Sequence, residues 1–274
     1  MPAAPAPTWD PGQYLRHADH RARPFGELLA RIPEPPATAP RIADLGCGPG
    51  NVTAQLAERW PTAHITGYDN SPEMLARAEA HAGETPGGGR LDFAHADVGR
   101  WLPEETYDVI VSNATLQWVP GHVESFAAWV DRLAPGGTFA FQVPGNFDAP
   151  SHVLMRELSE STRWQGLLGG VLRHADAVLT PADYLERLAA LGCAADVWET
   201  TYLHLLQGPD PDPVLDWVKG TGLRPVLTAL EGDPKARTEF LDAYRGLLRE
   251  AYPATGHGTV FPFRRVFAVA RKEN

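Results

Sequence analysis

The sequence contains few cysteines and no recognisable metal-binding pattern. Cys47 and Cys193 are the two cysteines of the 274-residue chain, and neither belongs to a Cys-x-x-Cys pair. Because a disulfide-stabilised fold needs more cysteines than this, we expect a reduced, cytoplasmic protein. The ten histidines form neither His-x-His nor His-Glu-x-x-His, so no metal site is predicted.

Long apolar segments and an excess of basic residues are also missing. No segment is continuously apolar for long enough to cross a bilayer. Residues 1–7 are rich in alanine and proline and lack the pattern of a signal peptide, so we expect residues 1–8 to be a disordered lead-in. The 34 acidic and 24 basic residues give a net charge of −10, whereas nucleic acid favours a basic surface. We therefore expect a small-molecule partner rather than nucleic acid or a membrane.

Short apolar segments alternate with helical patterns through the first half of the chain. This alternation predicts a parallel sheet with helices on both faces, that is, a doubly wound α/β fold. Seven strands are expected, at residues 41–45, 64–68, 91–94, 107–112, 138–143, 196–206 and 264–271. Further helices are expected at residues 125–133, 213–219 and 236–252.

The change of pattern after residue 146 indicates a core with helical insertions. Residues 9–146 are expected to form the ligand-binding core with an N-terminal helix. Residues 147–195 show helical patterns without a clear strand and are expected to form a helical lid. Residues 196–274 are expected to add the last strands of the sheet, with a second helical insertion at about residues 207–260.

A glycine-rich turn follows the first expected strand. It reads Asp44-Leu45-Gly46-Cys47-Gly48-Pro49-Gly50, and its glycines permit a sharp turn and the close approach of a ligand. Asn51 stands where the dinucleotide fingerprint of dehydrogenases has its third glycine, which argues against a nicotinamide-dependent dehydrogenase. Asp69 ends the second strand, where a carboxylate accepts hydrogen bonds from ribose, and Asp97 follows the third strand, close to where an adenine amino group would lie.

These residues resemble motif I and its partner positions in class I S-adenosylmethionine-dependent methyltransferases. The resemblance implies a Rossmann-like methyltransferase sheet in which the C-terminal strand at residues 266–270 runs antiparallel beside the fifth, and S-adenosylmethionine as the cofactor. The alternative is that the glycines serve only tight packing and that Asp69 only caps a helix. Cys47 is expected to be a buried small residue rather than a nucleophile. The cofactor-binding residues that we expect are Arg23, Asp44, Gly46, Gly48, Gly50, Asp69, Asn70, Ser71, Asp97, Val98 and Asn113.

Other segments resemble one branch of that superfamily, the trans-aconitate methyltransferases, nearly from end to end. The matching segments include residues 9–11, 112–120, 142–146, 196–204 and 261–265. The resemblance is most specific at residues 116–118 and 198–202, whereas residues 165–180 do not match. The resemblance implies esterification of trans-aconitate, an inhibitor of aconitase, to its monomethyl ester. Other acceptors stay open: another small carboxylic acid, a carrier-bound acyl group or a hydroxyl metabolite. A non-catalytic protein that binds S-adenosylmethionine is the alternative of another class.

A tricarboxylate acceptor requires several hydrogen-bond donors, preferably charged ones. Tyr202 and His204 are two positions apart on an expected strand and therefore share one face. For Arg21, an ordinary surface position is an equal alternative to a role in acceptor binding. For Trp118, the alternative is packing in the core. No catalytic residue is expected, because a carboxylate is already ionised at neutral pH and needs only to be held in line with the methyl group. The acceptor-binding residues that we expect are Arg21, Gln117, Trp118, Asn146, His152, Tyr202, His204 and Arg265.

Overall fold

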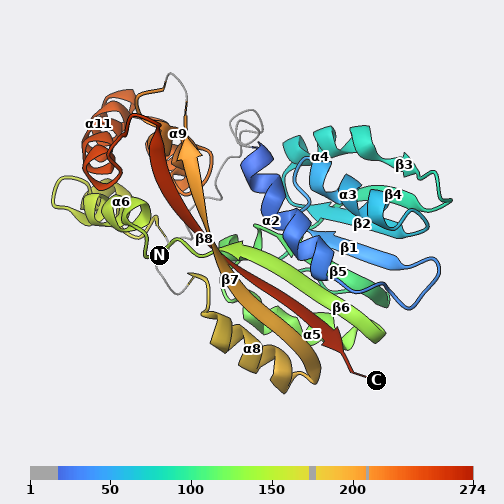
Figure 1. Cartoon of the computed structure of the whole chain (residues 1–274). Helices are drawn as coiled ribbons and strands as arrows, with labels where there is room; N and C mark the ends of the chain where they lie inside the picture. Colours follow the sequence, from blue (N-terminus) through green and yellow to red (C-terminus); the bar gives the residue numbers. More distant parts are fainter. Residues whose placement is uncertain (1–17, 173–176, 208–209, 274) are drawn as a thin grey trace. The chain divides into compact units, whose positions relative to one another are not determined.

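The computed structural model describes residues 18–172, 177–207 and 210–273, with only the backbone for residues 18–22 (Figure 1). The chain forms two compact units. Of the described residues, the sheet unit contains 21–144, 178–200 and 265–273, and the helical unit contains 18–20, 145–172, 177, 201–207 and 210–264. The sequence placed residues 147–195 in one insertion, but the structure groups 178–200 with the sheet unit instead.

The strands form one sheet of eight in the order β3-β4-β2-β1-β5-β6-β8-β7. The central strands are parallel, and β8 runs antiparallel to β6, with Phe141 opposite Ala268. The α/β fold with an antiparallel C-terminal strand is therefore confirmed. The additional strand β3 has two residues, too few for a periodic pattern to be visible in the sequence. The strands are β1 (Arg41–Leu45), β2 (His64–Asp69), β3 (Gly83–Glu84), β4 (Arg90–His95), β5 (Tyr107–Asn113), β6 (Leu133–Pro144), β7 (Cys193–Leu206) and β8 (Thr259–Lys272).

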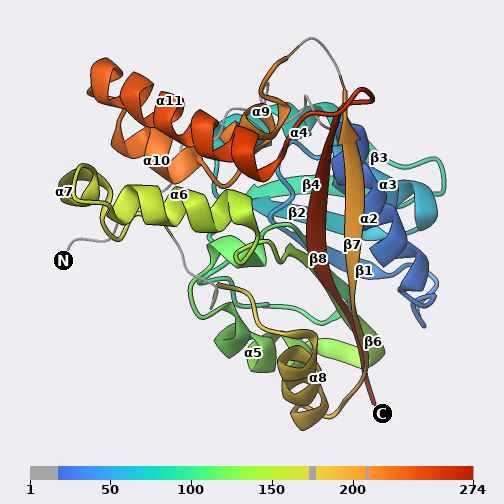
Figure 2. The same ribbon diagram turned by 60° about the vertical axis from the view of Figure 1, so that its left-hand side comes forward.

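Helices cover both faces of the sheet unit. Figure 2 shows α2 and α3 on one side of the sheet, and α5 and α8 on the other. The start of α4 follows the sequence pattern, because Ser71 caps it by accepting a hydrogen bond from the Met74 N–H and Pro72 is its first residue. The helices of this unit are α2 (Ala18–Arg31), α3 (Asn51–Arg59), α4 (Pro72–Ala78), α5 (Phe126–Asp131) and α8 (Pro181–Ala190), with 3-10 turns η1 (Glu79–His81), η2 (Leu116–Trp118) and η3 (His122–Ser125).

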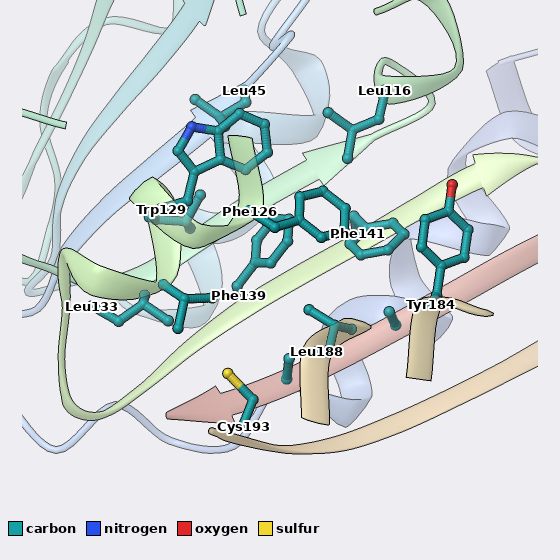
Figure 3. Close-up of a cluster of buried hydrophobic side chains, with 14 of the residues drawn as sticks. Leu45, Leu116, Phe126, Trp129, Leu133, Phe139, Phe141, Tyr184, Leu188 and Cys193 are labelled. Carbon is teal, nitrogen blue, oxygen red and sulfur yellow. The ribbon is translucent and has the colours of Figure 1, made fainter. Parts of the chain in front are cut away.

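The core of the sheet unit on the α5 and α8 side is aromatic. Figure 3 shows Phe139 and Phe141 of β6 packed between Phe126 of α5 and Tyr184 of α8. Because side chains alternate along a strand, Gln142 of β6 points to the opposite face, the side of α2. Arg265 of β8, which donates a hydrogen bond to Gln142, lies on the same face.

The helical unit has a core of its own. Tyr202 and His204 lie on the buried face of β7, whereas the intervening Leu203 is 71% exposed. Trp217 and Phe240 are fully buried in this core. The sequence predicted α9 with its observed bounds, placed the start of α11 two residues late and missed α10. The helices are α6 (Pro150–Glu160), α7 (Gln165–Leu168), α9 (Pro213–Lys219), α10 (Arg224–Ala229) and α11 (Pro234–Ala251). None of the helices in the described part of the chain is long and apolar enough to span a membrane.

Candidate cofactor site and acceptor residues

The three glycines between β1 and α3 have different structural roles. Gly46, Gly48 and Gly50 all adopt positive φ, at 80°, 56° and 81°, which favours glycine at each position. A Cβ atom on Gly46 would lie 2.1 Å from the Thr115 hydroxyl, and one on Gly50 would lie 3.0 Å from Ala78. A Cβ atom on Gly48 would have no neighbour within 4 Å. Gly46 and Gly50 are therefore required for packing, whereas Gly48 leaves open space where a ligand can approach.

Asp69 is the carboxylate that organises this turn. Its Oδ2 accepts a hydrogen bond from the Gly48 N–H and its Oδ1 one from the Ser71 N–H, each at 2.9 Å. Each oxygen has a second lone pair for a further donor. Asp69 thus both holds the glycine turn and retains acceptor capacity for the hydroxyl groups of a ligand. Its role is wider than the helix cap considered from the sequence.

We expect an Asp69→Asn variant to bind S-adenosylhomocysteine at least about 10-fold more weakly than wild type. The amide can keep one acceptor oxygen, but it replaces the other with a donor and removes the charge that strengthens each hydrogen bond. Isothermal titration measures the affinity, with Asp92→Asn on β4 as a matched control. Equal affinities of wild type and Asp69→Asn would exclude Asp69 as a ligand-binding residue.

Asp44 is buried at the end of β1. Its carboxylate is 1% exposed and accepts a hydrogen bond of 2.7 Å from the Thr53 hydroxyl. Burial raises the pKa of Asp44 to about 7, and the charge of Asp69 raises it further, while the Thr53 hydrogen bond opposes the shift. Asp44 therefore titrates near neutrality, and the charge that it presents to the glycine turn depends on pH.

Cys47 is unsuited to act as a nucleophile. Its side chain is 4% exposed. Burial raises the pKa of the Cys47 thiol well above its usual range, and the charges of Asp44 and Asp69 add to the shift. Because the thiolate is the reactive form, Cys47 stays an unreactive thiol, in line with the expectation from the sequence.

The other expected cofactor residues follow β2 and β4. Asn70 is exposed and precedes the α4 cap, Ser71. Asp97 is exposed, and its Oδ1 accepts a hydrogen bond of 2.9 Å from the Gly99 N–H. Val98 is buried in the apolar core beside these turns. Asp97 therefore stabilises the turn after β4, and its Oδ2 lies 3.9 Å from Nε of Arg100.

The segment after β5 bends sharply beside Gly46. Ala114 has a φ of 54° and is the one residue other than glycine with positive φ in the described part of the chain. Strained backbone of this kind is held by its surroundings and occurs often at functional sites. The Gln117 side chain donates a hydrogen bond to the Ala114 carbonyl, and the Thr115 hydroxyl donates one to the Gly46 carbonyl. Asn113 precedes the bend, and its buried Oδ1 has no hydrogen-bond partner among the described residues. Gln117 thus serves the bend, and Trp118, partly buried, ends the short η2 turn that follows it.

Arg265 of β8 lies on the α2 side of the sheet. Its hydrogen-bond partner, Gln142, was not among the site residues predicted from the sequence. Nη1 of Arg265 donates a hydrogen bond of 2.9 Å to the Oε1 of Gln142 on β6. Arg265 is 3% exposed and Gln142 fully buried. The signal for Gln142 was present in the sequence: it is a polar residue within the apolar segment 139–143.

Four expected acceptor residues lie in the helical unit. Asn146 is buried and its Oδ1 accepts a hydrogen bond from the Arg264 N–H. Burial, and then the charge of Arg156, lower the pKa of His152 to about 4, so His152 is neutral at pH 7 and offers no charged donor. Tyr202 and His204 stack at 6.0 Å between ring centroids on one face of β7, as the sequence predicts.

The N-terminal arginines are placed on α2. The backbone of Arg21 is helical, and its side chain lies outside the described part of the structure. Arg23 is exposed and pairs with Glu27 one turn along the helix, at 2.8 Å. The expected lead-in at residues 1–8, and the segment at residues 9–11 that carries part of the family resemblance, also lie outside the described residues.

These features of the sheet unit fit S-adenosylmethionine. Asp69 keeps acceptor capacity for ribose hydroxyl groups, Gly48 leaves room for the ligand, and the Asn113 oxygen suits an ammonium group. All three lie at the carboxyl ends of parallel strands or directly after them, where ligands of open α/β sheets bind.

Comparison with known proteins places the chain among methyltransferases. A family described as "Methyltransferase domain" matches residues 42–137. A trans-aconitate 2-methyltransferase of Streptomyces avermitilis is 73% identical over 274 residues, 100% of both chains, and one of Streptomyces coelicolor is 72% identical over 99% of this chain and 89% of its own. A relative of the same name from Rhodococcus jostii is 49% identical over 96% of this chain and 99% of its own.

Solved structures share the fold at low sequence identity. The YcgJ protein from Bacillus subtilis has a TM-score of 0.56 at 15% identity, covering 93% of this chain and 99% of its own. An S-adenosylmethionine-dependent methyltransferase from Mesorhizobium loti has a TM-score of 0.50 at 21% identity, with the same coverage. These likenesses establish the Rossmann-like methyltransferase fold of this chain.

Proposed function

Since this chain belongs to the trans-aconitate 2-methyltransferases, a family of S-adenosylmethionine-dependent methyltransferases, we propose that it converts trans-aconitate to its monomethyl ester. The observation that carries the proposal is the extent of the similarity to these relatives. The methyltransferase domain family matches residues 42–137 alone, whereas the 73% identity to the relative from Streptomyces avermitilis extends over the whole chain, the helical unit included. A superfamily motif says little about the acceptor, but similarity across the whole chain includes the residues that select it.

The residues of the sheet unit would hold the cofactor. Asp69 would accept hydrogen bonds from the ribose hydroxyl groups, and its contacts to the Gly48 and Ser71 N–H groups fix its position. Asn113 offers an acceptor oxygen. Bound S-adenosylmethionine supplies the methyl group and leaves as the neutral thioether. Arg265 is the acceptor-binding residue that we propose in this unit, because a guanidinium pairs well with carboxylates.

The chemical step that we propose is an in-line displacement. A carboxylate oxygen of the acceptor forms a bond to the methyl carbon while the bond from that carbon to sulfur breaks, and sulfur keeps the electron pair. No proton moves, because a carboxyl group with a pKa of about 4 is ionised at neutral pH. The protein therefore contributes orientation and the exclusion of water rather than a general base. The neutral state of His152 at pH 7 is compatible with this mechanism.

We expect selective methyl transfer to trans-aconitate in a panel that also contains cis-aconitate, isocitrate and citrate. The measurement is incorporation of label from S-adenosylmethionine together with formation of S-adenosylhomocysteine. At saturating cofactor, the rate should not rise with pH between about 5 and 8, because no general base has to lose a proton. Binding of the cofactor without labelling of any acid would refute the proposed acceptor and leave the cofactor site intact.

A further inference from the structure

The side-chain amide of Gln142 has an orientation that its surroundings determine. Its oxygen accepts a hydrogen bond of 2.9 Å from Nη1 of Arg265, and the two residues are only 0% and 3% exposed. A guanidinium has donors only, so the oxygen of the amide must face it. The NH2 group of Gln142 therefore points away from Arg265.

The NH2 group of Gln142 lacks a hydrogen-bond partner within the described part of the chain. A buried donor that stays unsatisfied costs about 1–3 kcal/mol, so such groups are uncommon unless a ligand or water satisfies them. Asn113 is the register neighbour of Gln142 on β5, and its Oδ1 is likewise buried without a described partner. The two unsatisfied atoms differ in kind: Gln142 presents a donor and Asn113 an acceptor.

We propose that Gln142, oriented by Arg265, donates a hydrogen bond to a carboxylate oxygen of the methyl acceptor and thereby selects carboxylates as substrates. This inference rests on the proposed function for the identity of the acid. An ionised carboxylate only accepts hydrogen bonds, so it matches the Gln142 donor and not the Asn113 oxygen. The positive charge of Arg265 directly behind the amide adds to the attraction for an anion. A carboxamide can offer its one oxygen to the Gln142 NH2 group, but it lacks the negative charge. Gln142 with Arg265 behind it therefore favours a carboxylate over a carboxamide at this position.

The decisive variant is Gln142→Glu, which has nearly the same shape. Its carboxylate keeps an acceptor for Arg265 and forms an ion pair with it, so the fold is retained. The variant replaces the donor with a negatively charged acceptor, which repels a carboxylate. We expect the KM for the acid to rise at least about 30-fold, while the affinity for S-adenosylhomocysteine changes less than about 3-fold.

A reversed substrate preference separates this role from a merely structural one. Wild type should prefer trans-aconitate over its monoamides, because the negative charge of a carboxylate strengthens the hydrogen bond from Gln142. Gln142→Glu should reduce that preference. For the monoamide that carries its amide at the position facing residue 142, the preference should reverse, because the introduced carboxylate can accept a hydrogen bond from the amide NH2 group of the substrate. A packing defect would lower kcat/KM for the acid and the amides to the same extent, and that result would overturn the inference.

Nuclear magnetic resonance of the wild-type protein tests the contact without turnover. The side-chain NH2 signal of Gln142 is identified by its absence from the Gln142→Glu spectrum, in protein saturated with S-adenosylhomocysteine. Addition of trans-aconitate or another acid of the panel should shift this signal. If wild type does not methylate trans-aconitate but another carboxylate shifts the signal, the proposed function fails and the inference stands. If no carboxylate shifts it, or if Gln142→Glu keeps the wild-type KM, the inference is wrong.

Discussion

A Gly46→Ala variant is expected to lose about 2–5 kcal/mol of its free energy of unfolding, even without any ligand. Its Cβ atom would lie 2.1 Å from Oγ1 and 2.6 Å from Cβ of Thr115, so the backbone or the Thr115 segment must move. The φ of 80° adds strain for any residue with a side chain. Urea unfolding of the cofactor-free protein, followed by circular dichroism, measures the loss.

Gly48→Ala is the matched control for this variant. Gly48 also has a positive φ, of 56°, but its added Cβ atom meets no neighbour within 4 Å, so about 1–2 kcal/mol should be lost. The same methyl group would occupy the space left for the ligand, and the affinity for S-adenosylhomocysteine should fall at least about 10-fold. Equal stabilities of the two variants would contradict the division into a packing glycine and a ligand-facing glycine.

This division between the glycines could not be predicted from the sequence. Gly46 and Gly48 stand in the same motif, and both suit a sharp turn before a helix. What distinguishes them is Thr115, which follows β5 and comes near Gly46 because β1 and β5 are neighbours in the sheet. The local pattern predicts a turn, whereas the contact that decides the role of each glycine is long-range.

The fold itself was predictable where periodicity is strong. The apolar segments that form β1 and β5 alternate with helical patterns in the sequence, and this alternation predicts a parallel sheet. The two-residue strand β3 and the six-residue helix α10 are too short to produce a periodic signal. The helix α8 has a clear amphipathic pattern and packs against the aromatic side chains of β6. The spacing of its apolar residues predicts a helix but does not reveal against which strand it packs.

The candidate site was predictable to a similar degree. Asp69 was identified from its position at the end of a strand, and the structure adds its two backbone hydrogen bonds. Gln142 was not selected, although a polar residue inside an apolar strand is informative. The neutral state of His152 depends on burial and on Arg156, and neither the extent of that burial nor its effect on the pKa can be read from the sequence.

The pH dependence of stability should depend strongly on Asp44. Its pKa is about 7 in the folded protein and about 3.8 in the unfolded chain. Between these values the folded state binds the proton and the unfolded state does not. The contribution of Asp44 to the free energy of unfolding is therefore retained below about pH 4 and lost as pH rises to about 7. The full loss is about 4 kcal/mol, on the scale of about 1.36 kcal/mol for each unit of pKa difference.

Asp44→Asn removes this titration while keeping an oxygen that can accept the Thr53 hydrogen bond. We expect the variant and wild type to have similar stabilities near pH 4, and the variant to become more stable by up to about 4 kcal/mol at about pH 8. Urea unfolding of both cofactor-free proteins between about pH 4 and pH 8 measures the difference. Thr53→Val provides the matched control: it removes the hydrogen bond that lowers the pKa of Asp44, so the wild-type loss of stability with pH should become larger. Parallel stability profiles of wild type and Asp44→Asn would show that folding does not raise the pKa of Asp44, and the charge at this end of β1 would then not respond to pH near neutrality.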